Sequence, residues 1–354
     1  MVPAKNIRSL SQEELTEWFL ARGEKKYRAN QVWEWLWKKQ ARHFDDMTNI
    51  SKELRDQMST AFTFPALSLY TTQHSTDGTI KAGFKTSDGN IMEGVLIPTD
   101  GRQTACVSSQ VGCSLGCKFC ATGFMGQLRN LTFDEIFDEA AMLNELALKH
   151  QGKKLSNIVY MGMGEPMLNY RNVLKSIERI TSNDGLAMSP RRITVSTSGI
   201  AKMIKRLGDD EVRFHLALSL HAASDEKRSR IMPINDSNNI ESLMEALEYF
   251  YAKTKNDITY EYILFKDLND NLKDADDLIK LYRRVPVRLI NLIEYNPIDQ
   301  ADFEKPDREK IQKFMDYLAA HRINVRLRLS RGKDIDAACG QLANKGMEKS
   351  AIGH

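Results

Sequence analysis

Apolar positions along the chain follow a helical period at first, then a strand-like one, and then alternate between the two. Near the N-terminus, Ser11 and Glu14 are spaced to form a capping box ahead of an apolar helical stripe. Two Asp-Gly pairs, at 77–78 and 88–89, then separate short β-branched and aromatic runs, a pattern typical of hairpins. The pattern predicts four parts: a small helical domain at 1–65, a β-hairpin extension at 66–103, an α/β core at 104–342 and a short tail at 343–354.

In the core, strand-like runs alternate with amphipathic helices, which predicts parallel strands joined by right-handed crossovers. Thr132 and Glu135 form a second predicted capping box, at the start of one crossover helix. About six such units predict a barrel or partial barrel, a fold whose active sites gather at the carboxyl ends of the strands. The expected strands are Thr104–Val107, Ile158–Met161, Ile193–Ser196, Phe214–Leu220, Ile258–Phe265 and Val287–Tyr295.

The composition is that of an ordinary soluble globular protein, with 42% hydrophobic and 27% charged residues. No apolar run is long enough to span a membrane and no signal-peptide layout is present, so we expect a cytoplasmic protein without a membrane partner. A net charge of +3 neither requires nor excludes a polyanionic partner. All four tryptophans fall among basic residues in the helical part; most should be core, and the basic face is a candidate RNA surface.

The cysteines carry the sharpest chemical signal. Cys113, Cys117 and Cys120 lie at C-x3-C-x2-C spacing directly after the first core strand, among glycines that let the loop turn. An odd count of five cysteines disfavours a disulfide framework, and a zinc site usually shows a second ligand pair. Structural thiols are the remaining alternative. Three thiolates suit a 4Fe-4S cluster with one iron open to a small molecule, the premise of radical S-adenosylmethionine (SAM) chemistry.

Other unusual residues also follow core strands. The glycines of the 162–166 loop could simply make a turn, but they also let the backbone approach a ligand, with Glu165 placed to hold a cofactor amine or hydroxyl. A single histidine such as His221 is more often structural than catalytic. Their shared position at strand ends strengthens each of them. These segments are Gly162-Met-Gly-Glu-Pro166, Ser196-Thr-Ser-Gly199, Ser219-Leu-His221 and Asn296-Pro297.

Taken together, the motifs resemble the RlmN methyltransferases, radical SAM enzymes that methylate carbon 2 of adenine in RNA. The resemblance covers nearly the whole chain and rests on the three cysteines and on segments 106–113, 162–166, 191–199, 219–221 and 334–342. It implies a partial (β/α)6 TIM-like barrel of the radical SAM type. It also implies SAM contacts from Gly164, Glu165, Ser196, Ser219, Leu220, His221 and Asn296.

The resemblance further implies a ping-pong mechanism that uses two SAM molecules per turnover. One SAM methylates Cys339, and a second is cleaved to a 5′-deoxyadenosyl radical that takes hydrogen from that methyl group. The resulting methylene radical adds to the adenine, and Cys106 resolves the adduct by forming a disulfide with Cys339. Glu93 is assigned as a proton acceptor; without the family it would be interpreted as a solvent-facing strand carboxylate.

The implied partners are 23S ribosomal RNA and the anticodon loop of transfer RNA, with flavodoxin or ferredoxin as electron donor. The sequence leaves open which RNA is used. The related Cfr group methylates carbon 8 and typically has Ala where this chain has Pro166, so Pro166 favours carbon 2. A non-catalytic iron–sulfur RNA-binding protein is a further alternative, which the presence of both Cys106 and Cys339 disfavours.

Some relatives continue past the methylated cysteine as a basic helical tail. Here the basic groups after Cys339 are few, namely Lys345, Lys349 and His354. We therefore expect RNA contacts on the N-terminal basic face and at Arg326, Arg328 and Arg331, the first two on one face of a strand.

Overall fold

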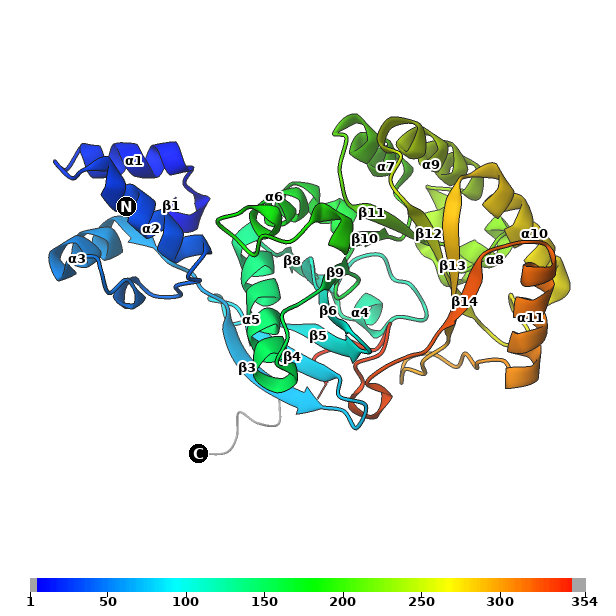
Figure 1. Cartoon of the computed structure of the whole chain (residues 1–354). Coiled ribbons are helices and arrows are strands. Elements are labelled where there is room, and N and C mark those ends of the chain that lie inside the picture. Colours follow the sequence, from blue (N-terminus) through cyan, green and yellow to red (C-terminus); the bar gives the residue numbers. More distant parts are fainter. Residues whose placement is uncertain (1–4, 346–354) are drawn as a thin grey trace.

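The structure is a computed structural model that describes residues 5–345. Three helices, α1 (Gln12–Leu20), α2 (Lys26–Trp37) and α3 (Lys52–Ala61), form the N-terminal domain, shown in blue in Figure 1. Two short strands, β1 (Lys5–Asn6) and β2 (Phe62–Thr63), pair in parallel and close this domain. The predicted capping box is confirmed, since Ser11 Oγ accepts from the amide of Glu14 while the Glu14 carboxylate accepts from the amide of Ser11.

The core is an open ten-stranded sheet in the order β14-β13-β12-β11-β10-β9-β6-β5-β4-β3. Its first seven strands are parallel, and six crossovers join them, so the predicted partial barrel with six β/α units is confirmed. The predicted capping box at the start of α5 is also confirmed. The parallel strands are β6 (Arg102–Val107), β9 (Asn157–Tyr160), β10 (Ile193–Thr197), β11 (His215–Ser219), β12 (Ile258–Leu264), β13 (Val287–Glu294) and β14 (Val325–Arg328).

Helices cover the outer face of this sheet (Figure 1). The sheet curves strongly, as the contact between Arg328 on β14 and the sulfur of Met161, just after β9, shows: these atoms lie 3.6 Å apart. The helices are α5 (Phe133–Gln151), α6 (Tyr170–Thr181), α7 (Ala201–Asp209), α8 (Asp225–Ile231), α9 (Ile240–Thr254), α10 (Leu272–Arg284) and α11 (Arg308–Ala320). Short 3-10 turns lie at Ile7–Ser9, Phe44–Asp46, Pro166–Asn169, Pro190–Arg192, Pro233–Asp236 and Lys333–Ile335.

The predicted hairpins are present, but they are not a separate appendage. Strands β3 (Ser68–His74), β4 (Ile80–Lys85) and β5 (Ile91–Thr99) run antiparallel, with Gly78 and Gly89 at positive φ in the two turns. The third of these strands then pairs with β6 along its second half. The hairpins therefore extend the core sheet, because the backbone groups of β6 that face away from β9 need partners as well.

The N-terminal domain docks on α5 through an aromatic seam. The Trp37 ring lies 5.9 Å from Phe133 and 5.3 Å from Phe137, between ring centroids. Trp33 and Trp37 are buried, as expected for core rings. The other two rings are only partly buried, and cations cover them at the surface: Arg22 lies 3.8 Å from the Trp18 ring and Lys39 lies 4.2 Å from the Trp35 ring.

Candidate active site

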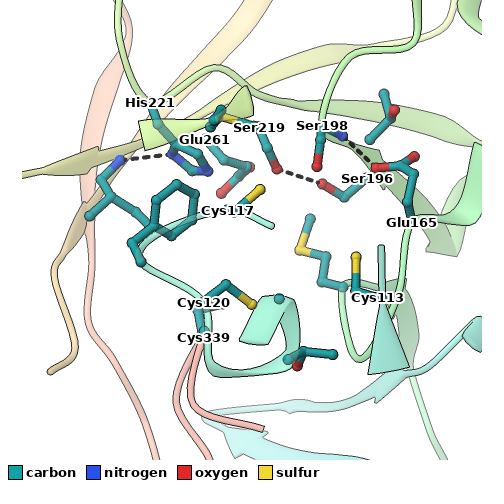
Figure 2. Close-up of a pocket in the computed structure, with 18 of the residues that line it drawn as sticks. Cys113, Cys117, Cys120, Glu165, Ser196, Ser198, Ser219, His221, Glu261 and Cys339 are labelled. Atoms are coloured by element: carbon teal, nitrogen blue, oxygen red, sulfur yellow. Dashed lines mark hydrogen bonds between the residues drawn. The ribbon is translucent and has the colours of Figure 1, made fainter. Parts of the chain in front are cut away.

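Three cysteines lie on a small hairpin between β6 and α5. Cys113 ends β7 (Gln110–Cys113), which pairs with β8 (Gly126–Asn130), and Cys120 caps the short helix α4 (Ala121–Phe124). With Cys117 they line one cavity, and Figure 2 shows the three sulfur atoms bordering the same space. Gly112 makes the hairpin possible: its φ is +76°, and an added Cβ would lie 1.8 Å from the carbonyl oxygen of Gly126.

The environment of these thiols suits a cationic cluster. Burial raises the pKa of the Cys113 thiol to about 11, and burial together with neighbouring thiols also raises the pKa of Cys117. A bound iron–sulfur cluster would relieve both costs by neutralising the thiolates. Within residues 5–345, no three His, Cys, Asp or Glu side chains are close enough to share a single metal ion.

The cavity continues from the cysteines to the strand ends, with an empty volume of about 860 Å³ that includes space open to solvent. Glu165 lies on this wall, where its carboxylate accepts from the amides of Met167 at 3.0 Å and Ser198 at 2.7 Å. Burial raises the pKa of this carboxyl, and these amides oppose that shift. Glu165 thus ties together the loops that follow β9 and β10 while it faces the cavity.

Gly164 beside it has a steric reason to be glycine. Its φ is +91°, and an added Cβ would lie 2.5 Å from Cβ of Gln110 on the cysteine hairpin. The main-chain amide of Glu165 donates to the side-chain oxygen of Gln110 at 2.8 Å. The close approach of the two loops brings the cysteine hairpin against the end of β9.

Ser196, Ser219 and His221 also line the cavity (Figure 2). The two serine hydroxyls lie 3.2 Å apart across the ends of β10 and β11. Nδ1 of His221 accepts from the amide of Ile263 at 3.1 Å, and burial lowers the pKa of His221 to about 3. The ring is therefore neutral, with its proton on Nε2, so it offers a hydrogen-bond donor to a ligand.

Two of the expected SAM contacts are not among the residues that line this cavity. Leu220 is buried in the core, its amide donating to the carbonyl of Glu261 and its carbonyl accepting from Arg228. Asn296 donates from its side-chain amide to the carbonyl oxygen of Cys339 at 3.2 Å. In the structure Asn296 therefore holds the Cys339 segment.

A second cavity, with an empty volume of about 720 Å³, adjoins the first. Cys106 on β6 lines the second cavity, and Cys339 lines both, so Cys339 lies where the two cavities meet. Arg328 also lines both, and its positive charge lowers the pKa of Cys106 while burial raises it overall. All five cysteines are free thiols, so no standing Cys106–Cys339 disulfide is present.

The interpretation of Glu93 as a solvent-facing carboxylate is wrong. The residue is 0% exposed, and its carboxylate lies 3.4 Å from Nζ of Lys81. It lines neither cavity, but it shares a face of β5 with Val95 and Ile97, which line the second one. The strand alternation alone could not reveal its burial, because the groups that cover it come from β4 and from the C-terminal segment.

Sequence reasoning also missed an ionic network inside the barrel. Arg328 lies 3.5 Å from the carboxylate of Glu261, whose other oxygen accepts from Asn291 at 2.6 Å. Arg326 donates to Asn291 at 2.7 Å, so the two arginines do share a face of β14, as predicted. That face points into the barrel. Arg331 lines the second cavity, whereas Lys349 and His354 lie outside the described residues.

Within the described residues, no helix combines the length and the apolar character needed to cross a bilayer.

Two models of known protein families match parts of this chain. The model described as the ribosomal RNA large subunit methyltransferase N-terminal domain matches residues 5–63, and the radical SAM superfamily model matches residues 107–281. A probable dual-specificity RNA methyltransferase RlmN from Cytophaga hutchinsonii is 54% identical over 97% of this chain and 94% of its own. Another from Christiangramia forsetii is 53% identical over 96% of this chain and 97% of its own.

Among solved structures, a radical SAM methyltransferase from Sphaerobacter thermophilus is similar over 96% of this chain and 99% of its own, with 39% identity and a TM-score of 0.89.

Proposed function

This chain belongs to the RlmN family of radical SAM RNA methyltransferases, and we propose that it methylates carbon 2 of an adenosine in 23S ribosomal RNA and of an adenosine in the anticodon loop of transfer RNA. The observation that carries the proposal is the position of Cys339. Cys339 lines both the cavity of the three cysteines and the cavity of Cys106. A thiol that first receives a methyl group and then delivers carbon to a base needs access to both.

The residues on the first cavity have separable roles. Cys113, Cys117 and Cys120 hold the 4Fe-4S cluster, and Glu165, Ser196, Ser219 and His221 bind SAM around it. When bound there, the cluster and SAM would supply the carbon radical that abstraction of a hydrogen atom from a methyl group requires. His221 contributes an N–H donor that persists at neutral pH, and Glu165 keeps two strand-end loops in register.

The residues near the second cavity complete the transfer. Cys339 carries the one-carbon unit. Cys106 attacks its sulfur, so that an S–S bond forms while the C–S bond breaks with its electron pair left on the carbon, which takes a proton to become the methyl group. A dithiol reductant then returns the disulfide to two thiols. Arg328 lies among these thiols, where its charge favours the attacking thiolate. Glu93 accepts the proton that leaves carbon 2, the C–H electron pair stays on the base, and the one surplus electron of the adduct leaves to a one-electron acceptor of the flavodoxin or ferredoxin class. Two SAM molecules are consumed per turnover, one for each stage.

The cation-covered rings of Trp18 and Trp35 support an RNA contact by the N-terminal domain, because RNA-binding surfaces combine basic groups with rings on which bases stack. Arg331 at the second cavity is a further candidate for a phosphate contact. A flavodoxin or ferredoxin supplies the electron. The protein acts in the cytoplasm, where its thiols stay reduced.

The test is anaerobic reconstitution of the chain with iron and sulfide, followed by reaction with SAM, reductant and each RNA in turn. We expect about four irons per chain, release of 5′-deoxyadenosine and formation of 2-methyladenosine by mass spectrometry. 8-Methyladenosine would instead place the protein with the carbon-8 enzymes. A cluster without SAM cleavage would support a non-catalytic RNA-binding role.

Cys106→Ala separates the stages of the reaction. This variant should methylate Cys339 and add to the RNA, but then stall, because no thiol is left to release the adduct. Purified protein should carry cross-linked, nuclease-sensitive RNA, whereas the Cys106→Ala/Cys339→Ala variant should carry none. A Cys106→Ala enzyme that turns over normally would remove Cys106 from the mechanism.

A further inference from the structure

A buried ion pair lies beneath the segment that carries Cys339. Lys81 on β4 and Glu93 on β5 are diagonal neighbours on one face of the antiparallel pair, since Lys81 is opposite Val95 and Glu93 is opposite Gly83. Their charged groups are 3.4 Å apart, and the two side chains are 2% and 0% exposed. Such a pair is costly to bury, so its presence calls for a reason beyond stability.

Both members of the pair also touch the Cys339 segment. The amide of Asn344 donates to Oε2 of Glu93 at 3.0 Å, and Nζ of Lys81 lies 3.5 Å from the carbonyl oxygen of Asp336. These contacts flank Cys339 on either side along the chain. The turn between β3 and β4 adds a further tie, because Ser75 donates to the carboxylate of Asp334 at 2.6 Å. The hairpins thus hold the segment that carries Cys339 at positions on both sides of this residue, and the Lys81–Glu93 ion pair supplies two of these contacts.

The surroundings of Glu93 set its charge. Burial raises the pKa of this carboxyl, whereas the Lys81 ammonium and the backbone amides of Asn344 and Ala343 oppose that shift. From β6, Ser108 meets Glu93 only at its main-chain carbonyl, to which it donates at 2.7 Å. Glu139 of α5 packs under Gly94, on the opposite face of β5. Lys81 is therefore the cation that keeps Glu93 in the form able to accept a proton.

We propose that Lys81 is a positioning residue of the methyl transfer, which holds Glu93 ionised and oriented beneath the segment that carries Cys339. The inference rests on the proposed role of Glu93 as proton acceptor. Lys81 does not touch the base; it acts through Glu93. Its charge matters more than its packing, so an arginine should replace it in part and a methionine of similar length should not.

The first test needs no RNA. In holoenzyme labelled with ¹³C at glutamate carboxyls, with Glu93→Gln to assign the signal, the titration midpoint of Glu93 should move to higher pH in Lys81→Met. Lys81→Arg should restore it toward the parent value. Lys85→Met is the matched control, because Lys85 is an exposed lysine on the same strand. An unchanged midpoint in Lys81→Met would overturn the proposal.

The second test measures turnover. At neutral pH, Lys81→Met should slow RNA methylation by about 100-fold, within the range that a general base contributes. Methylation of Cys339 and SAM cleavage should stay normal, and raising the pH should recover part of the rate, because Glu93 then ionises. If the parent enzyme forms no 2-methyladenosine, the proposed function fails. The titration still tests whether Lys81 keeps Glu93 ionised, because it needs no RNA. If the parent is active and Lys81→Met matches it, the inference fails.

Loss of folding is a separate outcome that the design resolves. Lys81→Met leaves a buried carboxylate without its cation, which destabilises a fold. The Lys81→Met/Glu93→Gln variant removes both charges and should regain thermal stability while RNA methylation stays low. Recovery of methylation in this double variant would contradict the proposal, because it would show that the pair serves only the fold.

Discussion

Two buried ion pairs differ in the kind of atom that each leaves without a hydrogen-bond partner within the described residues: a donor, Nε of Arg8, in one pair and an acceptor, Oε1 of Glu93, in the other. Arg8 and Asp138 join the N-terminal domain to α5 at 2.6 Å, with further hydrogen bonds from Arg8 to the carbonyls of Leu36 and Ala41. The Arg8 guanidinium also lies against the Trp37 ring. Lys81 and Glu93 are farther apart, at 3.4 Å, and Oε1 of Glu93 has no hydrogen-bond partner within the described residues.

This difference distinguishes a pair that stabilises the fold from a pair that is suited to proton transfer. A buried charge whose hydrogen bonds are supplied by surrounding backbone and rings stabilises one arrangement of the chain. A buried carboxylate with a free acceptor, next to a cavity, keeps the capacity to take a proton. We therefore expect that breaking the first pair costs stability, and that breaking the second costs chemistry.

The largest effect is expected from Glu93→Gln. RNA methylation should fall by about 10²- to 10⁴-fold, the contribution typical of a general base, because an amide cannot accept the proton. Single-turnover assays of 2-methyladenosine formation measure this loss, with methylation of Cys339 as the internal control. Asp138→Asn is the matched variant in the other pair and should keep the transfer rate. Equal losses in both variants would erase the distinction between the pairs.

Arg8→Met should instead lower the free energy of unfolding by about 3–5 kcal/mol, because it leaves Asp138 buried without its cation. Urea unfolding followed by tryptophan fluorescence suits this measurement, since all four tryptophans lie in the N-terminal domain. Arg8→Met/Asp138→Leu should recover most of the loss. A midpoint unchanged by Arg8→Met would show that the aromatic seam alone docks the domain.

Glu139 extends the comparison of the two ion pairs, because it is a buried carboxyl with no cationic partner within the described residues. Both of its oxygens face the amide of Ser108, and burial raises its pKa well above the ordinary value. Between its unfolded and folded pKa values the folded state binds more protons, so stability falls as pH rises through that range. Glu139→Gln lacks this titration. Its stability relative to the parent should therefore increase with pH, whereas a constant difference would exclude a raised pKa.

The smallest effect is expected at the surface. Lys313 and Glu309 are 2.7 Å apart on α11 but 71% and 78% exposed. Glu309→Ala should change the free energy of unfolding by no more than about 0.5 kcal/mol, because water screens the pair. Thermal unfolding at low and high salt checks this, and a loss above about 1 kcal/mol would mean that burial is not what separates these pairs.

Local signals in the sequence were enough to predict the frame of the molecule. The capping boxes at Ser11 and Thr132 and the turns at Gly78 and Gly89 depend on residues a few positions apart, and all four are present. The alternation of strands and helices predicted the partial barrel for the same reason, because each β/α unit is a nearly local structure.

The site could be predicted only where its residues form a recognisable motif over a short stretch of sequence. The spacing of Cys113, Cys117 and Cys120 gave the candidate cluster loop. The partners of Glu93 could not be predicted, because Asn344 lies 251 residues away in sequence and Lys81 on another strand. The inward direction of Arg328 was likewise hidden, since alternation places residues on a face without saying which face is buried.

Among residues 5–345, strand β14 is one end of the sheet order, so one of its backbone edges has no neighbouring strand. Such edges tend to recruit strands from other molecules and to start aggregation, and inward-pointing charges are one natural safeguard. Arg326 and Arg328 reach Asn291 and Glu261 of the neighbouring strands from a strand of only four residues. An added strand would find little length to pair with. The shortness of β14 and the two arginines on one of its faces therefore both disfavour strand addition at this edge.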